Sequence, residues 1–145
     1  MRLWHKDLIP VLPRQQLLGQ WSECCLIAKN IVKNGTPNHI LVNKIMNYPI
    51  EHFYRYAFNV YEEMIYRNYK VDDTKFSKWF NAEWSDYISV KNDKLFADWH
   101  NERYFRQCIF NLEEKYDCGG ITKDEWEKIR EYTWKHYYSY EIGER

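Results

Sequence analysis

The stretch MRLWHKDLIPVLPRQQLLGQWSECCLI, residues 1–27, decides how the fold begins. It opens with a short aromatic and basic arm. Pro10 and Pro13 then bracket an extended or turn segment, because proline disfavours helix in the residue before it. Pro13 also suits the first turn of a helix, and Asn34-Gly35 suits the end of one. Between them, apolar side chains recur at helical spacing: Leu17, Trp21, Cys24, Ala28 and Ile31. The sequence therefore predicts an arm followed by a long helix.

The rest of the chain has the same helical character. Thr36-Pro37 and Thr122 with Glu125 are helix-start signals, and Asn47-Tyr48-Pro49 is a break. Residues 85–92 fit a loop or a brief extended piece. The apolar spacing predicts helices over His39–Met46, 50–69, 95–116 and 123–139. It also predicts a short helix after residues 72–74, which carries Phe76, Trp79 and Phe80. No linker interrupts the pattern, so we expect an all-α, compact helical bundle that forms a single domain over residues 1–145.

Composition limits the classes of function. Aromatic residues make up 19% of the 145 residues, more than a core of this size needs, so part of them must lie at the surface. The net charge is zero, which argues against a nonspecific polyanion binder. The charge is uneven, however. Residues 1–70 hold 9 Lys/Arg against 5 Asp/Glu, and residues 71–145 hold 12 against 16, so a local basic face remains possible in the first half.

Neither a metal site nor a membrane segment is indicated. The four cysteines, Cys24, Cys25, Cys108 and Cys118, form no C-x-x-C pair, and the five histidines match no metal-binding spacing. No apolar run of 18 residues and no signal peptide is present. We therefore expect a soluble cytoplasmic protein with reduced thiols, no metal and no cofactor.

Glu23 is the carboxylate of interest in the first helix. On a helical wheel it shares a stripe with Gln16, Gln20 and Ile27, which places it at the border of core and solvent. It is the only acid between Asp7 and Glu51. Two readings follow: an ordinary solvated glutamate, or an isolated catalytic carboxylate in a neutral-to-basic stretch.

The same stretch carries a resemblance to a known family. Its register reads Leu8, Leu12, Gln15, Leu17, an aromatic at Trp21 and the acid at Glu23. This resembles the N-terminus of the pyrimidine-dimer DNA glycosylases of the phage endonuclease V type. A weaker similarity to the central helix of that family runs over residues 52–70. The resemblance implies a monomer that acts on damaged double-stranded DNA, with an N-terminal arm that threads among the helices.

The resemblance also implies a mechanism. The family flips a nucleotide out of the duplex, and the α-amino group of its own chain attacks C1′ of the sugar to form an imine. An α-amine has a pKa of about 7.7–8.0, against about 10.4 for lysine, so a useful fraction is neutral at physiological pH. The glutamate assists ring opening and accepts the proton that starts strand cleavage. Glu23 takes this role here, and the candidate nucleophiles are the nitrogens of Met1 and Arg2.

Two residues depart from the family pattern. Phage-type members have a small second residue, which allows removal of the initiator methionine, whereas Arg2 is expected to retain Met1. The nucleophile is then the Met1 amine, one residue further out, or no amine is correctly placed. Ser22 stands where the resemblance leads us to expect an arginine, and serine cannot form the bidentate phosphate contact of arginine. The alternative function is therefore a catalytically inactive nucleic-acid-binding or protein-interaction domain on the same scaffold.

The candidate DNA-binding residues are basic and lie near Glu23 in the sequence: His5, Lys6, Arg14, Lys29 and Lys33. The alternative reading is a solvated helix face. Aromatic residues gather from Tyr132 to Tyr140 and could stack on bases. The spacing of Trp126, Ile129 and Thr133 with Tyr137 and Tyr140 fits core packing equally well.

Overall fold

The described part of the chain is helical, as predicted. The computed structural model describes residues 1–72 and 74–136, and it contains no strand within them. The elements are the 3-10 helices η1 (Lys6–Val11) and η2 (Asn43–Asn47) and the α-helices α1 (Arg14–Asn34), α2 (Ile50–Tyr66), α3 (Thr74–Trp79), α4 (Trp84–Ile88), α5 (Glu102–Asp117) and α6 (Lys123–His136). Buried side chains from the arm and from most of these helices join one hydrophobic cluster.

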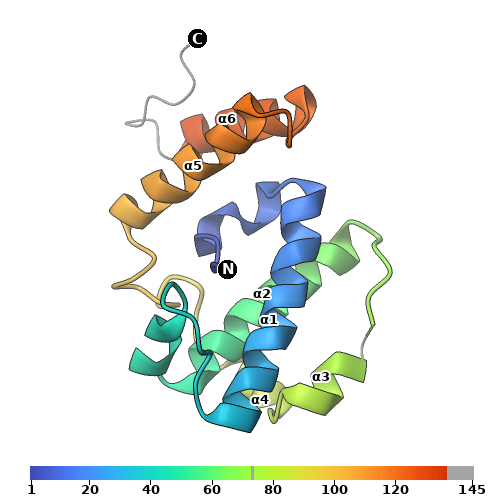
Figure 1. The fold of residues 1–145 in the computed structure, drawn as a ribbon, viewed down its shortest axis with the longest axis vertical. Coiled ribbons are helices and arrows are strands. Elements are labelled where there is room, and N and C mark those ends of the chain that lie inside the picture. The colour runs from blue at the N-terminus through green and yellow to red at the C-terminus, as the bar shows by residue number, and fades with distance from the viewer. Residues whose placement is uncertain (73, 137–145) are drawn as a thin grey trace.

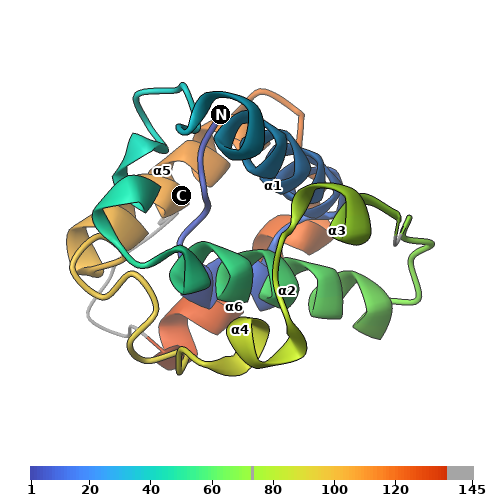
Figure 2. The ribbon, with the colours of Figure 1, turned by 90° about the horizontal axis from the view of Figure 1, so that it is seen from below.

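The N-terminal arm runs through the middle of the molecule. In Figure 1 it lies between α5 and α6 on one side and α1 and α2 on the other, and Figure 2 shows it passing among the same helices. Leu3, Trp4 and Leu8 are buried. Burial of these apolar side chains fixes the arm in place, so the predicted threading of the arm among the helices is confirmed.

The first long helix has the predicted bounds. Pro13 precedes Arg14, the first helical residue, and Gly35 ends the helix in the left-handed region with φ of 74°. The Gly35 N–H donates to Ile31 O at 2.9 Å, which satisfies one of the last carbonyls. Leu17, Trp21 and Cys24 face the core as predicted.

The second long helix buries one apolar stripe. Its buried residues are Phe53, Tyr56, Ala57, Val60 and Met64. Ile65 lies off this stripe and is 48% exposed. The helix ends at Tyr66 rather than at residue 69, because Asn68 adopts a left-handed conformation with φ of 62°.

The side chain of Arg67 ties the end of α2 to the first segment. Its guanidinium donates to Leu12 O at 2.8 Å and to Pro10 O at 3.1 Å, and it pairs with Glu63 at 2.8 Å. A planar group with five donors suits several carbonyls and a carboxylate at once. Arg67 therefore positions η1, and through it the arm that precedes η1.

Two predicted helices are wrong in part. The helix predicted over His39–Met46 is a turn followed by η2, because Asn38 takes a positive φ of 60° and interrupts any helix there. The helix predicted from residue 95 begins at Glu102. Asn101 is its N-cap, and the Asn101 side chain accepts a hydrogen bond from Tyr104 N at 2.9 Å.

Of the remaining elements, one differs from the prediction and one agrees with it. Part of residues 85–92, predicted as loop or extended, forms the short helix α4 with a capping box between Glu83 and Asp86. The predicted Thr122–Glu125 capping box begins α6, with Glu125 N donating to Thr122 Oγ1 at 3.2 Å. Tyr137, Tyr138 and Tyr140 lie outside the described residues. None of the helices described is long and apolar enough to cross a bilayer.

Candidate active site

The arm is held against α1 by the side chain of Gln20. Gln20 Oε1 accepts from Trp4 N at 2.7 Å, and Gln20 Nε2 donates to Arg2 O at 2.9 Å. The Tyr56 hydroxyl, from α2, lies 2.6 Å from Trp4 O and 2.9 Å from Gln20 Oε1. Gln20 is 1% exposed, so one buried amide satisfies two backbone groups of the arm.

Glu23 lies one turn further along the same face. Its Oε2 accepts from the backbone N–H of Arg2 and from Gln20 Nε2, each at 3.3 Å. The side chain of Glu23 is half-buried, which confirms its predicted place at the border of core and solvent. The structure therefore brings Glu23 and the nitrogen of residue 2 within hydrogen-bond distance, although 21 residues separate them in the chain.

The Arg2 side chain contacts Trp4 and Cys108. Its guanidinium lies 5.3 Å from the centre of the Trp4 ring, and its Nη1 lies 3.9 Å from Cys108 Sγ on α5. The hydroxyl of Tyr104, also on α5, donates to Leu3 O. The arm is thus fixed from α1, α2 and α5 together, so the position of its first nitrogens is set by tertiary contacts.

The Gln20 contacts give a prediction. We expect Gln20→Leu to lower the free energy of unfolding by about 1–3 kcal/mol, because it leaves the buried Trp4 N–H without its acceptor. Urea unfolding measures this change, and proteolysis after Arg2 and Lys6 should become faster. Gln15→Leu, at an exposed glutamine of the same helix, is the matched control and should change the free energy by less than about 0.5 kcal/mol. Equal effects of the two substitutions would contradict the role of Gln20 in holding the arm.

His5 is buried rather than available to DNA. It is 2% exposed, its Nδ1 accepts from Asp7 N at 3.1 Å, and its Nε2 lies 2.9 Å from His100 O. His100 is also buried, and its Nδ1 accepts from Lys6 N at 2.9 Å. Desolvation lowers the pKa of His5 to about 4 and lowers the pKa of His100 well below its usual value. Both rings are therefore neutral at pH 7 and act as structural acceptors for the arm backbone.

These pKa shifts predict acid sensitivity. The unfolded chain binds a proton at His5 near pH 6.5, and the folded chain binds it only near pH 4. The contribution of neutral His5 to the free energy of unfolding is therefore fully present above pH 6.5 and is lost as the pH falls from 6.5 to 4. For His5 the loss is about 3 kcal/mol by pH 4. Urea unfolding followed by tryptophan fluorescence at several pH values measures this loss. His5→Gln should flatten the profile, and a flat profile of the unchanged protein between pH 7 and 5 would refute the assignment.

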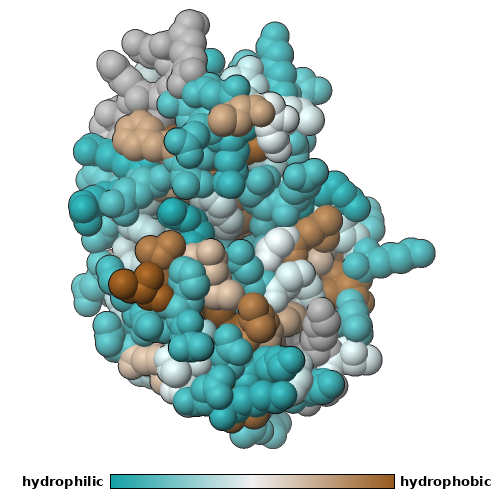
Figure 3. All heavy atoms as spheres, in the orientation of Figure 1, coloured by the Kyte–Doolittle hydropathy of each residue, from teal (hydrophilic) through white to brown (hydrophobic). Residues whose placement is uncertain are grey.

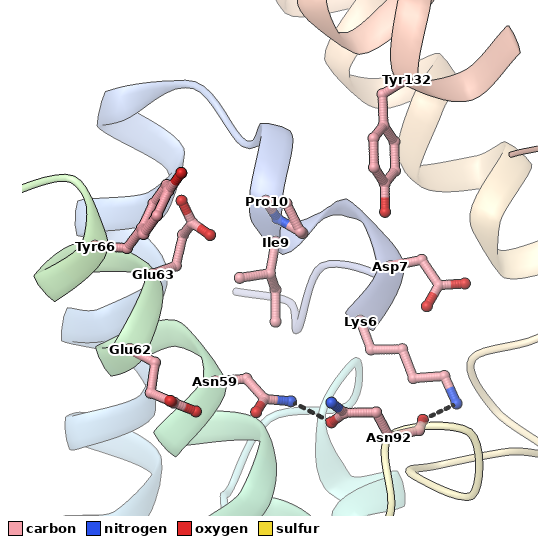
Figure 4. A pocket seen from close by; sticks show the side chains of 10 residues that line it. All are labelled: Lys6, Asp7, Ile9, Pro10, Asn59, Glu62, Glu63, Tyr66, Asn92 and Tyr132. Carbon is pink, nitrogen blue, oxygen red and sulfur yellow. Dashed lines mark hydrogen bonds between the residues drawn. The ribbon is translucent and has the colours of Figure 1, made fainter. Parts of the chain in front are cut away.

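Lys6 faces a different part of the surface from Glu23. Its Nζ donates to Leu95 O at 2.7 Å and to Asn92 O at 2.8 Å, so the ammonium group is held by carbonyls. Lys6 lines a pocket of about 440 Å³. The other lining residues are Asp7, Ile9, Pro10, Asn59, Glu62, Glu63, Tyr66, Asn92 and Tyr132, as Figure 4 shows. Three carboxylates around this pocket would repel phosphate, and Glu23 is not among its residues.

The other basic candidates divide into two places. The Arg14 guanidinium lies 4.4 Å from the centre of the Tyr69 ring, at the start of α1. Lys29 and Lys33, on the second half of α1, lie 5.7 and 5.5 Å from the Trp79 ring centre. The structure thus brings Lys29 and Lys33 together and keeps Arg14 and Lys6 apart from them.

Three residues that position the site were not among the predicted site residues: Gln20, Tyr56 and Tyr104. The sequence contains a signal for Gln20, because an amide on the flank of an apolar stripe, next to an isolated acid, needs a buried hydrogen-bond partner. Tyr56 and Tyr104 had none, because tyrosine in an apolar stripe is equally compatible with simple packing. Among the C-terminal aromatics that the structure describes, Tyr132 is half-buried and Trp134 is 65% exposed.

No metal centre is found among the described residues, where no three His, Cys, Asp or Glu side chains gather to hold an ion.

A family model described as pyrimidine dimer DNA glycosylase matches residues 1–77, which is more than half of the chain. The match includes the arm, η1, α1, η2 and α2, and therefore both Glu23 and the backbone that it contacts. No curated protein matches the chain, and no solved structure does.

Proposed function

This chain belongs to the pyrimidine dimer DNA glycosylase family, and we propose that it is a DNA repair glycosylase and abasic-site lyase. We place it in the cytoplasm as a monomer, acting on double-stranded DNA that carries pyrimidine dimers or related damaged bases. The catalytic groups are an amine at the start of the chain and the Glu23 carboxylate. The observation that supports this function most directly is the 3.3 Å contact between Glu23 Oε2 and the backbone nitrogen of Arg2.

The proposed reaction follows from these two groups. The neutral amine attacks C1′ of the damaged nucleotide, the glycosidic bond breaks, and the base leaves with its bonding electrons and takes a proton. Opening of the sugar ring, with a proton delivered to O4′, gives an iminium ion between C1′ and the amine. Glu23 then takes a proton from C2′, and the 3′-phosphate leaves with the electron pair of the C3′–O bond. Water releases the enzyme from the cleaved strand.

The half-buried position of Glu23 suits this work. A carboxylate near a forming iminium ion stabilises the positive charge more strongly when little water lies between them. Gln20, which donates to the same oxygen of Glu23, limits the rotation of the carboxylate. Glu23 is the only acid between Asp7 and Glu51, so few charges compete with it for the amine in this stretch.

Trapping of the imine tests the proposed function. The protein is incubated with duplex DNA that bears one abasic site, and borohydride is added to reduce any imine to a stable amine bond. We expect a covalent protein–DNA species that is absent when the chain is acetylated at its N-terminus beforehand. Absence of this species at every DNA concentration would refute the lyase and leave the inactive nucleic-acid-binding or protein-interaction domain as the function of the scaffold.

A further inference from the structure

The loop between α1 and α2 presents apolar side chains to solvent at its tip. Ile40 is 83% exposed and Leu41 is 50% exposed, whereas the next anchors, Val42 and Ile45, are 0% and 1% exposed. The chain thus buries one pair of aliphatic residues and leaves the neighbouring pair outside. Figure 3 shows hydrophobic residues on the face of the molecule where this loop lies in Figure 1.

Hydrogen bonds hold this tip in one shape. Asn43 Oδ1 accepts from His39 N at 3.0 Å, and His39 O accepts from Val42 N at 3.0 Å. On the other side, Asn30 Nδ2, from α1, donates to Pro37 O at 3.1 Å. A loop tied at both ends loses little conformational entropy on binding, so an apolar tip of this kind is prepared to enter another molecule.

The tip lies on the side of the molecule that carries Glu23. Asn30, which anchors the loop, stands seven positions after Glu23 on nearly the same stripe of α1, a rise of about 10 Å. In both Figure 1 and Figure 2 the loop before η2 lies beside the N-terminus. The tip and the catalytic groups can therefore meet the same ligand.

The segment that carries the tip has no acid that would repel a polyanion. Between Glu23 and Glu51 the sequence contains three lysines, Lys29, Lys33 and Lys44, and no acid. The acidic pocket of Asp7, Glu62 and Glu63 lies elsewhere, on η1 and α2. In a molecule with no net charge, the absence of acids from this segment leaves its surface open to phosphates.

We propose that Ile40 and Leu41 form a wedge that enters the base stack of duplex DNA beside the damaged nucleotide and helps to expose its sugar to the amine and Glu23. This rests on the proposed function. Proteins that bend DNA insert aliphatic side chains between base steps in this way, and phosphate contacts offset the cost of unstacking. Lys44, which is exposed and lies four residues after Ile40, is expected to contact a phosphate.

The test compares the double variant Ile40→Ser, Leu41→Ser with the control Ile88→Ser, which removes from α4 an isoleucine whose exposure, 47%, is close to that of Leu41. Rates of borohydride trapping are measured on an abasic site in duplex DNA and on the same site in single-stranded DNA. We expect the double variant to be slower by about 10-fold or more on the duplex and unchanged within about 2-fold on the single strand, since only the duplex must be unstacked. The control should match the unchanged protein on both.

A second readout does not need catalysis. 2-Aminopurine next to the abasic site becomes brighter when it unstacks, and we expect this rise with the unchanged protein and its loss with the double variant. Equal trapping rates and equal fluorescence for the unchanged protein and the double variant would overturn the wedge. The wedge is also overturned if light scattering shows that the unchanged protein is a dimer and that loss of this dimer is the only change in the double variant. If no protein traps DNA, the proposed lyase fails alone. The fluorescence difference then decides the wedge, and absence of any rise with the unchanged protein overturns it.

Discussion

Glu23→Gln should reduce the rate of imine trapping and of strand cleavage at an abasic site by about 10³-fold, within the usual range for loss of a general acid or base. The change keeps the size and hydrogen-bonding capacity of the side chain, so Gln20 and the Arg2 N–H retain a partner. The variant cannot accept the C2′ proton or balance the charge of the iminium ion. Quench-flow trapping under single-turnover conditions measures the effect without interference from product release.

Glu62→Gln is the matched control for this substitution. Glu62 is exposed and belongs to the acidic pocket rather than to the contacts of the arm with α1. It removes one negative charge, as Glu23→Gln does, and should leave the trapping rate within about 2-fold, because a distant exposed charge is screened by salt. Similar losses in both variants would show that the net charge matters and that Glu23 has no specific role.

Protein that begins at Arg2 should trap an abasic site about 10²-fold faster than protein that keeps Met1. The nitrogen of residue 2 lies 3.3 Å from Glu23, but it is an amide while Met1 is attached and cannot act as a nucleophile. In protein that starts at Arg2 the same nitrogen is an amine, already next to the carboxylate. The Met1 amine lies one residue further out, and a displacement of 1 Å can cost about 10²-fold in rate.

Cleavage of a fusion protein directly before Arg2 yields the shorter chain, and intact mass confirms the first residue of each preparation. A third preparation, with Gly-Ser added before Met1, controls for any effect of chain length and should be slower still. If the protein that keeps Met1 is the fastest, the nucleophile is the Met1 amine and the arm must shift when DNA binds. If the three preparations trap equally, the N-terminal amine is not the nucleophile.

Local sequence signals were sufficient for the boundaries set by strong caps. Pro13 and Gly35 delimit α1, and the Thr122–Glu125 box begins α6, because each acts through backbone groups a few residues away. They were insufficient at residues 36–47 and 95–101. Partners outside each segment contribute there: Asn30 Nδ2, from α1, donates to Pro37 O, and His52 Nδ1 accepts from the N–H of the left-handed Phe96 at 3.1 Å.

The candidate site shows the same division between what local sequence signals predict and what distant contacts decide. The periodicity of α1 placed Glu23 at the edge of the core, since helical geometry alone fixes which side chains share a stripe. The candidate DNA contacts share closeness to Glu23 in the sequence, and closeness in the sequence does not reveal which of them lie together in the fold. His5 is buried under α5 and Lys6 is bound to carbonyls of the 92–95 segment, whereas Lys29 and Lys33 meet at Trp79.

By itself, then, the sequence of residues 1–27 determined an arm, a helix and one isolated carboxylate on its flank, because these depend on spacing and on nearest-neighbour backbone effects. Only the tertiary structure decided that the arm returns along α1 and places the nitrogen of residue 2 against Glu23. Gln20, Tyr56 and Tyr104 hold the arm there from three different helices. Contacts of this kind join groups up to 101 residues apart in the chain, and their free energy depends on burial that only the folded core provides.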